Sequence, residues 1–347
     1  MTSKSSPSTI RTVAERAGVS VATVSHVLNG TRHVSDALRA RVEAAMRDLD
    51  FVPSAIARSL KQRQTHTIGM MTPNSSNPYF AEIVQYVEDH GFGAGYHVVL
   101  CNSNDDPRRQ SAYLQVLAER RIDGLVLVPT GDDATVLAQL DGLRMPVVLL
   151  DRPLAGMRFD AVCNDNRAGA RLAVQHLVGL GHRRIGCIGD SPATAVSCER
   201  EAGWREVLAE AGLADQAPEV QYGHFTAQGG FDAMQRLLQQ PQPPTAVFAC
   251  NDAMAIGALG ALAQAGLAAP ADVSIVGYDD VDLAHWVHPA LTTVAQPKQQ
   301  MSRLAVDLLI ERIERRRHEA QTRALAPSLV VRASSAAPRV AAAAPAL

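Results

Sequence analysis

The chain has 347 residues, 47% of them hydrophobic and 20% charged, which suits a globular protein of two or three domains with a sizeable core. No apolar run reaches the roughly 18 residues of a membrane helix, and the N-terminus lacks the apolar stretch of a secretory signal. The five cysteines are scattered, which disfavours a disulfide framework and a zinc ribbon. We therefore expect a cytoplasmic protein without membrane contact.

Charge is unevenly distributed along the chain. The formal net charge is −2, yet residues 1–67 carry +5 and the remainder carries −7. A basic segment on a larger acidic body indicates that only this segment meets a polyanion such as nucleic acid. A solvated charged face would give the same balance.

Residues 8–52 are predicted to form three short helices in a small head. Each helix has apolar residues at spacings of three and four and a polar or glycine residue at its boundary. Gly18 ends the first helix, and Ser20 and Ser35 are the expected N-caps of the second and third. The apolar positions are Ile10, Val13, Ala14 and Ala17; Val24, Val27 and Leu28; and Leu38, Val42, Met46 and Leu49.

Helix, glycine-containing turn and helix form the arrangement that places a second helix in the major groove of DNA. The turn is residues 17–20, so Val21 and Ala22 would contact thymine methyl groups or apolar base edges, and His26 would donate to guanine N7 or O6. The other predicted contacts of the head, mainly with phosphates, are Thr23, Ser25, Asn29 and Arg32. An ordinary helical bundle can show the same pattern.

Residues 53–66 are interpreted as a hinge helix and linker. Pro53 suits a first helical turn, and Ile56, Ala57 and Leu60 share one face. Nine residues are too few for an isolated helix in water, where about 12–15 is already marginal. We therefore expect residues 53–61 to be helical only when a partner and DNA bury the apolar face, although an ordinary linker helix would have a similar sequence.

From residue 67 onward, short apolar runs alternate with amphipathic stretches. This pattern predicts an α/β fold of parallel, doubly wound sheets with helices on both faces. The expected strands are 67–71, 97–101, 124–128, 146–150, 184–188, 245–249 and 273–276. The expected helices are 81–91, 109–120, 168–179, 254–265 and 301–317. Residues 333–347 form a low-complexity tail that we expect to be disordered.

Two motifs resemble a known family. Thr9-Ile-x-x-Val-Ala-x-x-Ala-Gly-Val-Ser-x-x-Thr-Val-Ser-x-Val-Leu-Asn29 and Pro53-Ser-Ala-Ile-Ala-Arg-Ser-Leu-Lys61 are similar to the N-terminal signature of the lactose-repressor family of bacterial regulators. The resemblance covers nearly the whole chain and is strongest to the ribose and purine repressors, through residues 23–27 and 57–61. The chain departs from the family pattern at Thr12, where many members have Asp, and at the pair Val21-Ala22. The operator sequence of the ribose and purine repressors therefore cannot be transferred to this chain.

The resemblance implies a core like that of periplasmic sugar-binding proteins, with two α/β lobes, three crossovers and a ligand between the lobes. The first lobe would comprise about 67–162 and 293–326, and the second about 163–292 and 327–332. It also implies that two hinge helices pair in the minor groove, where Leu60 wedges between base steps beside Lys61. Ile56 and Ala57 are counted with these hinge contacts.

Polar and aromatic residues follow several expected strands, where open α/β sheets bind ligands. Planar hydrogen-bonding groups suit sugar hydroxyls, and aromatic faces suit the C–H side of a sugar ring. The candidates are Asn77, Tyr79, Phe80, Asp151, Arg152, Arg200, Phe225, Asn251, Asp279 and Gln296. All but Arg200 match ligand residues of ribose-binding proteins; Arg200 matches a family arginine near the cleft, and a structural salt bridge is an equal alternative. Val128 and residues 194–198 depart from the ribose pattern, and Asp252 is interpreted as a helix N-cap.

Together these features predict a homodimeric repressor of sugar-utilisation genes that binds operator DNA and is released by a small sugar such as ribose. A purine-type repressor that needs a corepressor is the alternative, because the same head, hinge and cleft would serve a ligand that tightens DNA binding as well as one that weakens it. We expect no catalytic residues, cofactor or metal. A doubly wound enzyme is disfavoured because Gly91-x-Gly-x-Gly95 precedes a strand and is better interpreted as a helix end. A periplasmic sugar carrier is disfavoured by the basic head.

Overall fold

The computed structural model describes residues 9–29, 32–51, 64–154, 158–317 and 319–339. They fall into two units, a head within residues 1–65 and a core within residues 66–347, each described below by itself. The expected hinge helix, with its candidate DNA contacts Ile56, Ala57, Leu60 and Lys61, lies outside the described residues.

The head contains the three predicted helices: α1 (Ile10–Ala17), α2 (Val21–Asn29) and α3 (Asp36–Asp48). Helix α1 begins with a reciprocal cap, in which Thr9 N donates to Thr12 Oγ1 at 2.9 Å and Thr12 N donates to Thr9 Oγ1 at 3.3 Å. Ser35 precedes α3 but its side chain makes no capping hydrogen bond. The buried core consists of Val13, Ala14, Ala17, Val24, Val42 and Ala45. The predicted apolar positions lie in or against this core except Leu38, which is half-buried outside the cluster.

The first lobe of the core is a parallel sheet of six strands in the order β11-β5-β4-β3-β1-β2. The strands are β1 (Thr67–Thr72), β2 (His97–Asn102), β3 (Gly124–Leu127), β4 (Val147–Asp151), β5 (Asp160–Asn164) and β11 (Thr322–Leu325). The helices are α5 (Pro78–Gly93), α6 (Pro107–Glu119), α7 (Asp133–Leu140) and α13 (Lys298–Ile313).

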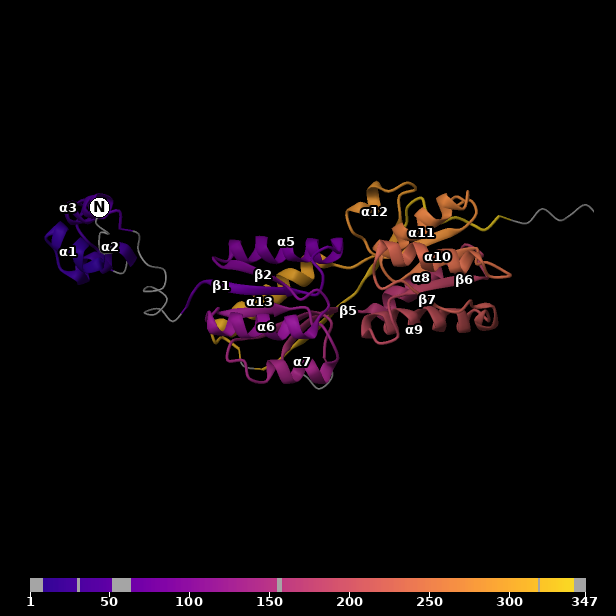
Figure 1. Cartoon of the computed structure of the whole chain (residues 1–347), viewed down its shortest axis with the longest axis horizontal. Coiled ribbons are helices and arrows are strands. Elements are labelled where there is room, and N and C mark those ends of the chain that lie inside the picture. Colours follow the sequence, from indigo (N-terminus) through magenta and orange to yellow (C-terminus); the bar gives the residue numbers. More distant parts are fainter. Residues whose placement is uncertain (1–8, 30–31, 52–63, 155–157, 318, 340–347) are drawn as a thin grey trace, which may run out of the picture. The chain divides into compact units, whose positions relative to one another are not determined.

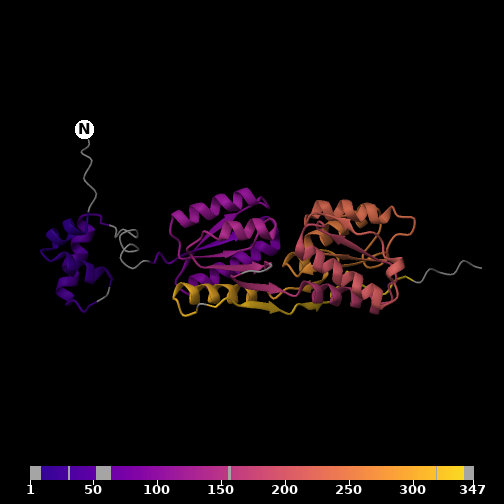
Figure 2. The ribbon, with the colours of Figure 1, turned by 90° about the horizontal axis from the view of Figure 1, so that it is seen from below.

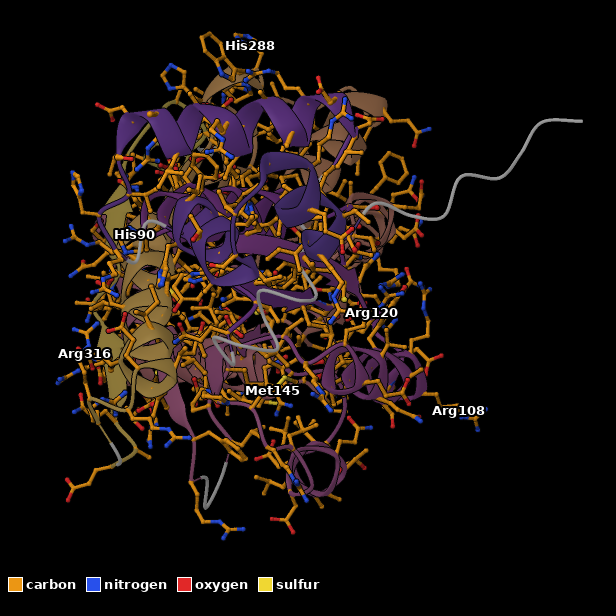
Figure 3. All side chains as sticks on the ribbon, turned by 90° about the vertical axis from the view of Figure 1, so that its left-hand side faces the viewer. His90, Arg108, Arg120, Met145, His288 and Arg316 are labelled. Carbon is orange, nitrogen blue, oxygen red and sulfur yellow. The ribbon has the colours of Figure 1, made fainter. Side chains whose placement is uncertain are left out.

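Alternate side chains of these strands pack on opposite faces of the sheet, as the period of a strand requires. Met70 joins the cluster under α5 and α13, whereas Met71 joins the cluster under α6 and α7. Figure 1 shows α5 on one side of the lobe and α6 and α7 on the other. His90 near the end of α5 lies beside α13 (Figure 3), with its Nε2 2.7 Å from Asp307 Oδ1.

The second lobe has the sheet order β12-β10-β9-β8-β6-β7, parallel except for the antiparallel pair β10–β12. Its strands are β6 (Ile185–Gly189), β7 (Gln221–Tyr222), β8 (Ala246–Ala249), β9 (Ser274–Asp279), β10 (Thr292–Ala295) and β12 (Ser328–Val330). Its helices are α8 (Asn166–Gly179), α9 (Ala195–Glu210), the 3-10 turn η1 (Ala214–Gln216), α10 (Ala227–Leu238), α11 (Asp252–Gln264) and α12 (Leu283–Trp286).

The chain passes between the two sheets three times, after β5, after β10 and after β11. Figure 2 shows the last passage, where the yellow segment runs from α13 through β11 to β12. The strands shift the expected lobe boundaries, because β5 belongs to the first sheet as far as Asn164 and all of β10 belongs to the second. The boundaries at 162 and 293 fell inside these two strands.

The prediction of disorder from residue 333 is wrong for residues 333–339. Ser334 is fully buried, and its Oγ donates to Ile275 O at 2.6 Å and accepts from Thr292 N at 2.8 Å. The carbonyl of Ala336 accepts from Ser274 Oγ at 3.0 Å. Low complexity did not prevent order here, since small residues fit against the first residues of β9 and β10. Residues 340–347 lie outside the described part.

The observed ends of α5 and α13 can be compared with the helix boundaries expected from the sequence. Helix α5 ends at Gly93 and Gly95 has φ +85°, so the glycine run ends a helix, as predicted. Helix α13 spans 298–313 rather than 301–317. Within the part of the chain that the structure describes, no helix is long and apolar enough to cross a membrane.

Candidate functional site

The turn of the head is held in the geometry that a helix-turn-helix needs. Gly18 has φ +62°, a left-handed conformation that favours glycine, and Arg41 Nη2 donates to Ala17 O at 2.7 Å and to Gly18 O at 3.3 Å. Ser20 Oγ accepts from Thr23 N at 3.1 Å, so Ser20 caps α2 as predicted. The start of α2 is thereby fixed relative to α1 and α3.

The first residues of α2 face solvent. Val21 is 43% exposed and Ala22 is also exposed, as a base-reading helix requires. The other described candidates are Thr23, Ser25 and His26, which are half-buried, and Arg32, which is exposed. The Thr23 hydroxyl lies 2.9 Å from Ser20 Oγ, so it takes part in the cap. The side chain of Asn29 is outside the described set.

The core contains a cleft of about 530 Å³ whose walls come from both lobes. Its lining residues follow β1, β2, β3 and β4 in the first lobe and β6 and β7 in the second, at the carboxyl ends of the strands. Five candidate ligand residues line it: Asn77, Phe80, Asp151, Arg152 and Phe225. Val128 and residues 194–196, where the sequence departs from the ribose pattern, line it too.

The other candidates do not line the cleft. Tyr79, Arg200, Asp279 and Gln296 form a buried network attached to it, whereas Asn251 Nδ2 donates to Phe225 O at 3.3 Å. Tyr79 Oη donates toward Asp151 Oδ1 at 2.7 Å and lies 3.1 Å from Gln296 Oε1. Gln296 Nε2 in turn donates to Asp279 Oδ1 at 2.8 Å. Since Asp151 is in the first lobe, Gln296 in a crossover and Asp279 in the second lobe, the network joins the cleft wall to both lobes.

Arg200 adds a positive charge to this network. Its Nη1 lies 3.6 Å from Asp279 Oδ1 and donates to Cys250 O at 2.5 Å, while its Nε donates to Asn166 Oδ1 at 2.8 Å. Its Cζ lies 3.8 Å above the ring of Tyr278, a cation–π geometry. The structural salt bridge considered for Arg200 is therefore present, and a ligand contact stays a prediction.

Asn251 takes the N-cap role that was expected for Asp252. Asn251 Oδ1 accepts from Met254 N at 2.8 Å, so Asn251 and not Asp252 is the N-cap of α11. Asp252 is fully buried one residue later, where its carboxylate accepts from Thr293 Oγ1 at 2.6 Å and from Val281 N at 2.9 Å. The two side chains differ by one residue in sequence, which pattern alone could not resolve.

Burial dominates the electrostatics below the cleft. The pKa of Asp279 is raised to about 7, mainly by desolvation; the positive charge of Arg200 opposes this shift, and the negative charge of Asp151 adds to it. Desolvation also raises the pKa of Asp151 above its ordinary value, against the hydrogen bond from Tyr79. Carboxyl groups kept this far from water are costly for stability, which points to a functional use.

Backbone strain gathers at the same place. Asp151, Asp279 and Phe225 have φ of +71°, +117° and +50°, although none is a glycine. Such conformations cost on the order of 1–3 kcal/mol each and cluster at ligand sites. Arg152 is fixed as well, with Nη1 2.5 Å from Asp133 Oδ1 and Nη2 2.8 Å from Gly131 O.

The titratable cleft residues that were missed as ligand candidates are Asp105, Asp132, Asp190 and His224. Asp105 and Asp190 follow the expected strands 97–101 and 184–188, so the strand-end rule would have found both. His224 follows β7, whose two residues are too short to give a sequence pattern. Among the described residues, no group of three or more His, Cys, Asp or Glu side chains is placed to hold a metal ion.

Comparison with known proteins matches both units. The family model "Bacterial regulatory proteins, lacI family" matches residues 9–54, and "Periplasmic binding protein-like domain" matches residues 174–335. The ribose operon repressor of Escherichia coli (strain K12) is 42% identical over 328 residues, 94% of this chain and 99% of the relative. The HTH-type transcriptional repressor PurR of Edwardsiella ictaluri (strain 93-146) is 41% identical over 330 residues, 94% of this chain and 97% of the relative.

Solved structures agree with these relatives. The lac repressor dimer bound to operator and the anti-inducer ONPF has a TM-score of 0.86 at 30% identity, covering 96% of this chain and 100% of that chain. A LacI family transcriptional regulator from Enterococcus faecium with bound ribose has a TM-score of 0.72 at 30% identity, covering 79% of this chain and 100% of that chain. This chain therefore belongs to the lacI family of bacterial regulatory proteins, not to a family of enzymes.

Proposed function

We propose that this protein is a cytoplasmic homodimeric repressor that binds operator DNA through its head and leaves it when ribose or a similar sugar binds in the core cleft. The observation that carries the proposal is the combination of a helix-turn-helix head with a cleft lined from both lobes. Relatives named as repressors and a relative crystallised with ribose support it.

In the head, α2 is the proposed recognition helix. The exposed Val21 and Ala22 suit apolar base edges, and His26 is the proposed hydrogen-bond donor to guanine. Twofold symmetry of the dimer suits a pseudo-palindromic operator. Leu60 of the hinge is the proposed minor-groove wedge, so Leu60→Ala should weaken specific DNA binding and spare sugar binding.

In the core, Phe80 and Phe225 reach the cleft from opposite lobes and are the proposed aromatic contacts of the sugar. Asn77, Asp151 and Arg152 supply planar hydrogen-bonding groups. Tyr79, Gln296, Asp279 and Arg200 then connect the bound sugar to both lobes. A coupling of about 1–3 kcal/mol between cleft and head would change operator affinity roughly 5–150-fold.

A gel shift on the protein's own promoter region, with and without ribose, tests the proposal. We expect a shift that ribose abolishes, and Asp279→Ala should keep the shift while losing the ribose response. A promoter that is never shifted would overturn the DNA-binding function. A normal ribose response of Asp279→Ala would remove Asp279 from the coupling.

The purine-type alternative is favoured by the nearly equal identity to the PurR relative. The same gel shift separates the two, because a corepressor tightens DNA binding whereas an inducer weakens it. Calorimetry with ribose, hexoses and purine bases identifies the ligand class. A shift that needs an added purine base and ignores every sugar would replace the sugar proposal.

A further inference from the structure

The walls of the core cleft are strongly acidic. Four carboxylates line it: Asp105, Asp132 and Asp151 from the first lobe and Asp190 from the second. Among the described lining residues, Arg152 is the only lysine or arginine. A ligand entering the cleft therefore meets an excess of negative charge.

The positive charge of Arg152 is already compensated. Its Nη1 lies 2.5 Å from Asp133 Oδ1, and its Nη2 donates to Gly131 O at 2.8 Å. Below the cleft, Arg200 is likewise paired with Asp279, and Lys298 Nζ lies 2.8 Å from Glu82 Oε2. A phosphate group in the cleft would have to compete with these carboxylates for its cation.

Asp105 and Asp190 line the same cleft from opposite lobes. Burial raises the pKa of Asp105, and the negative charge of Asp190 raises it further. The Asp190 carboxylate accepts a hydrogen bond from Thr194 Oγ1, whereas no described residue donates to the Asp105 carboxylate. His224 lies close enough for its charge, when protonated, to lower the pKa of Asp190.

We propose that Asp105 and Asp190 select the effector by charge: the cleft takes an uncharged polyol and rejects the phosphorylated form of the same sugar. This inference rests on the proposed function, in which the cleft holds the effector. Hydroxyl groups donate hydrogen bonds to carboxylates, whereas a phosphate dianion offers acceptors only and is repelled. Rejection of a related ligand by repulsive groups is a common source of specificity.

Calorimetry on the full chain at neutral pH tests the selection, with ribose against ribose 5-phosphate and glucose against glucose 6-phosphate. We expect at least one free sugar to bind about tenfold or more tightly than its phosphate ester, equivalent to about 1.4 kcal/mol. The double variant Asp105→Asn, Asp190→Asn should bind the ester about tenfold more tightly than the wild type does. Each single variant should give part of this gain.

The matched control is Asp215→Asn, which removes the same charge from an exposed position in η1 outside the cleft. It should leave both affinities unchanged, and an equal gain in this control would overturn local selection. Unaltered Trp204 fluorescence verifies that each variant is folded. An ester that binds the wild type as tightly as its free sugar, or a preference that survives in the double variant, also overturns the inference.

A gel shift on promoter DNA tests the proposed repressor function separately from effector selection. If an ester binds tightly and releases the promoter, the inference fails and the repressor function stands. If no sugar or ester binds although the promoter is shifted, both the sugar effector and this inference fail.

Discussion

Asp279→Asn is expected to remove a large pH dependence of stability from the second lobe. The pKa of Asp279 is about 7 in the folded protein, against an ordinary value of 3.8. The folded state therefore binds this proton more tightly than the unfolded chain does. The resulting stabilisation is fully present below the ordinary value and is lost as the pH rises through about 7.

The magnitude follows from the shift. Between pH 5 and pH 8, about two of the roughly three pKa units of difference are titrated, so Asp279 should contribute about 3 kcal/mol less stability at pH 8 than at pH 5. Asparagine stays neutral throughout and keeps an oxygen that accepts from Gln296 Nε2. The wild type should therefore lose about 3 kcal/mol more than the variant over this range.

Urea unfolding followed by tryptophan fluorescence measures this difference. The chain has two tryptophans, and Trp204 is 2% exposed within the second lobe whereas Trp286 is 71% exposed. The change in signal therefore comes mainly from Trp204. Asp215→Asn, at an exposed position of the same lobe, is the control and should follow the wild type.

Equal losses of stability in the wild type and in Asp279→Asn between pH 5 and pH 8 would refute this reasoning. That result would mean that Asp279 is ionised in the folded state at both pH values. A smaller loss in the control variant than in the wild type would point instead to the general charge of the lobe.

Three further substitutions test other parts of the structure. Gly18→Ala should destabilise the head by about 1–2 kcal/mol, because φ is +62° and the new Cβ would lie 2.7 Å from Arg41 Nη2. We expect weaker promoter binding and unchanged sugar binding by calorimetry. Unchanged promoter binding would contradict this prediction. Gly169→Ala would place a Cβ 2.3 Å from Tyr278 Oη. In a gel shift, this variant should still bind the promoter but should no longer be released by sugar. Normal release by sugar would show that the Tyr278 ring can move freely. Tyr79→Phe removes the hydroxyl that donates to Asp151 Oδ1 and Gln296 Oε1, and it should lower the free energy of unfolding by about 1–3 kcal/mol. Urea unfolding measures this loss, and an unchanged midpoint would mean that water replaces the hydroxyl.

Local patterns determined much of this protein in advance. The spacing of apolar residues predicted the three helices of the head, and Gly18 and Ser20 marked the turn between the first two. Alternating strands and helices predicted parallel sheets with covered faces. These features depend on the period of the backbone and on residues within one or two turns, so the sequence carries them directly.

Tertiary structure decided which side chains meet. Tyr79 and Gln296 share a hydrogen bond although 217 residues separate them, and half of the candidate ligand residues do not line the cleft. Ser334 is ordered because it completes hydrogen bonds at the beginnings of β9 and β10, about 40 to 60 residues away in the sequence. Asp105 and Asp190 line one cleft only because the two lobes bring the ends of β2 and β6 together. Burial and partner choice arise from contacts between distant segments, and no local pattern encodes them.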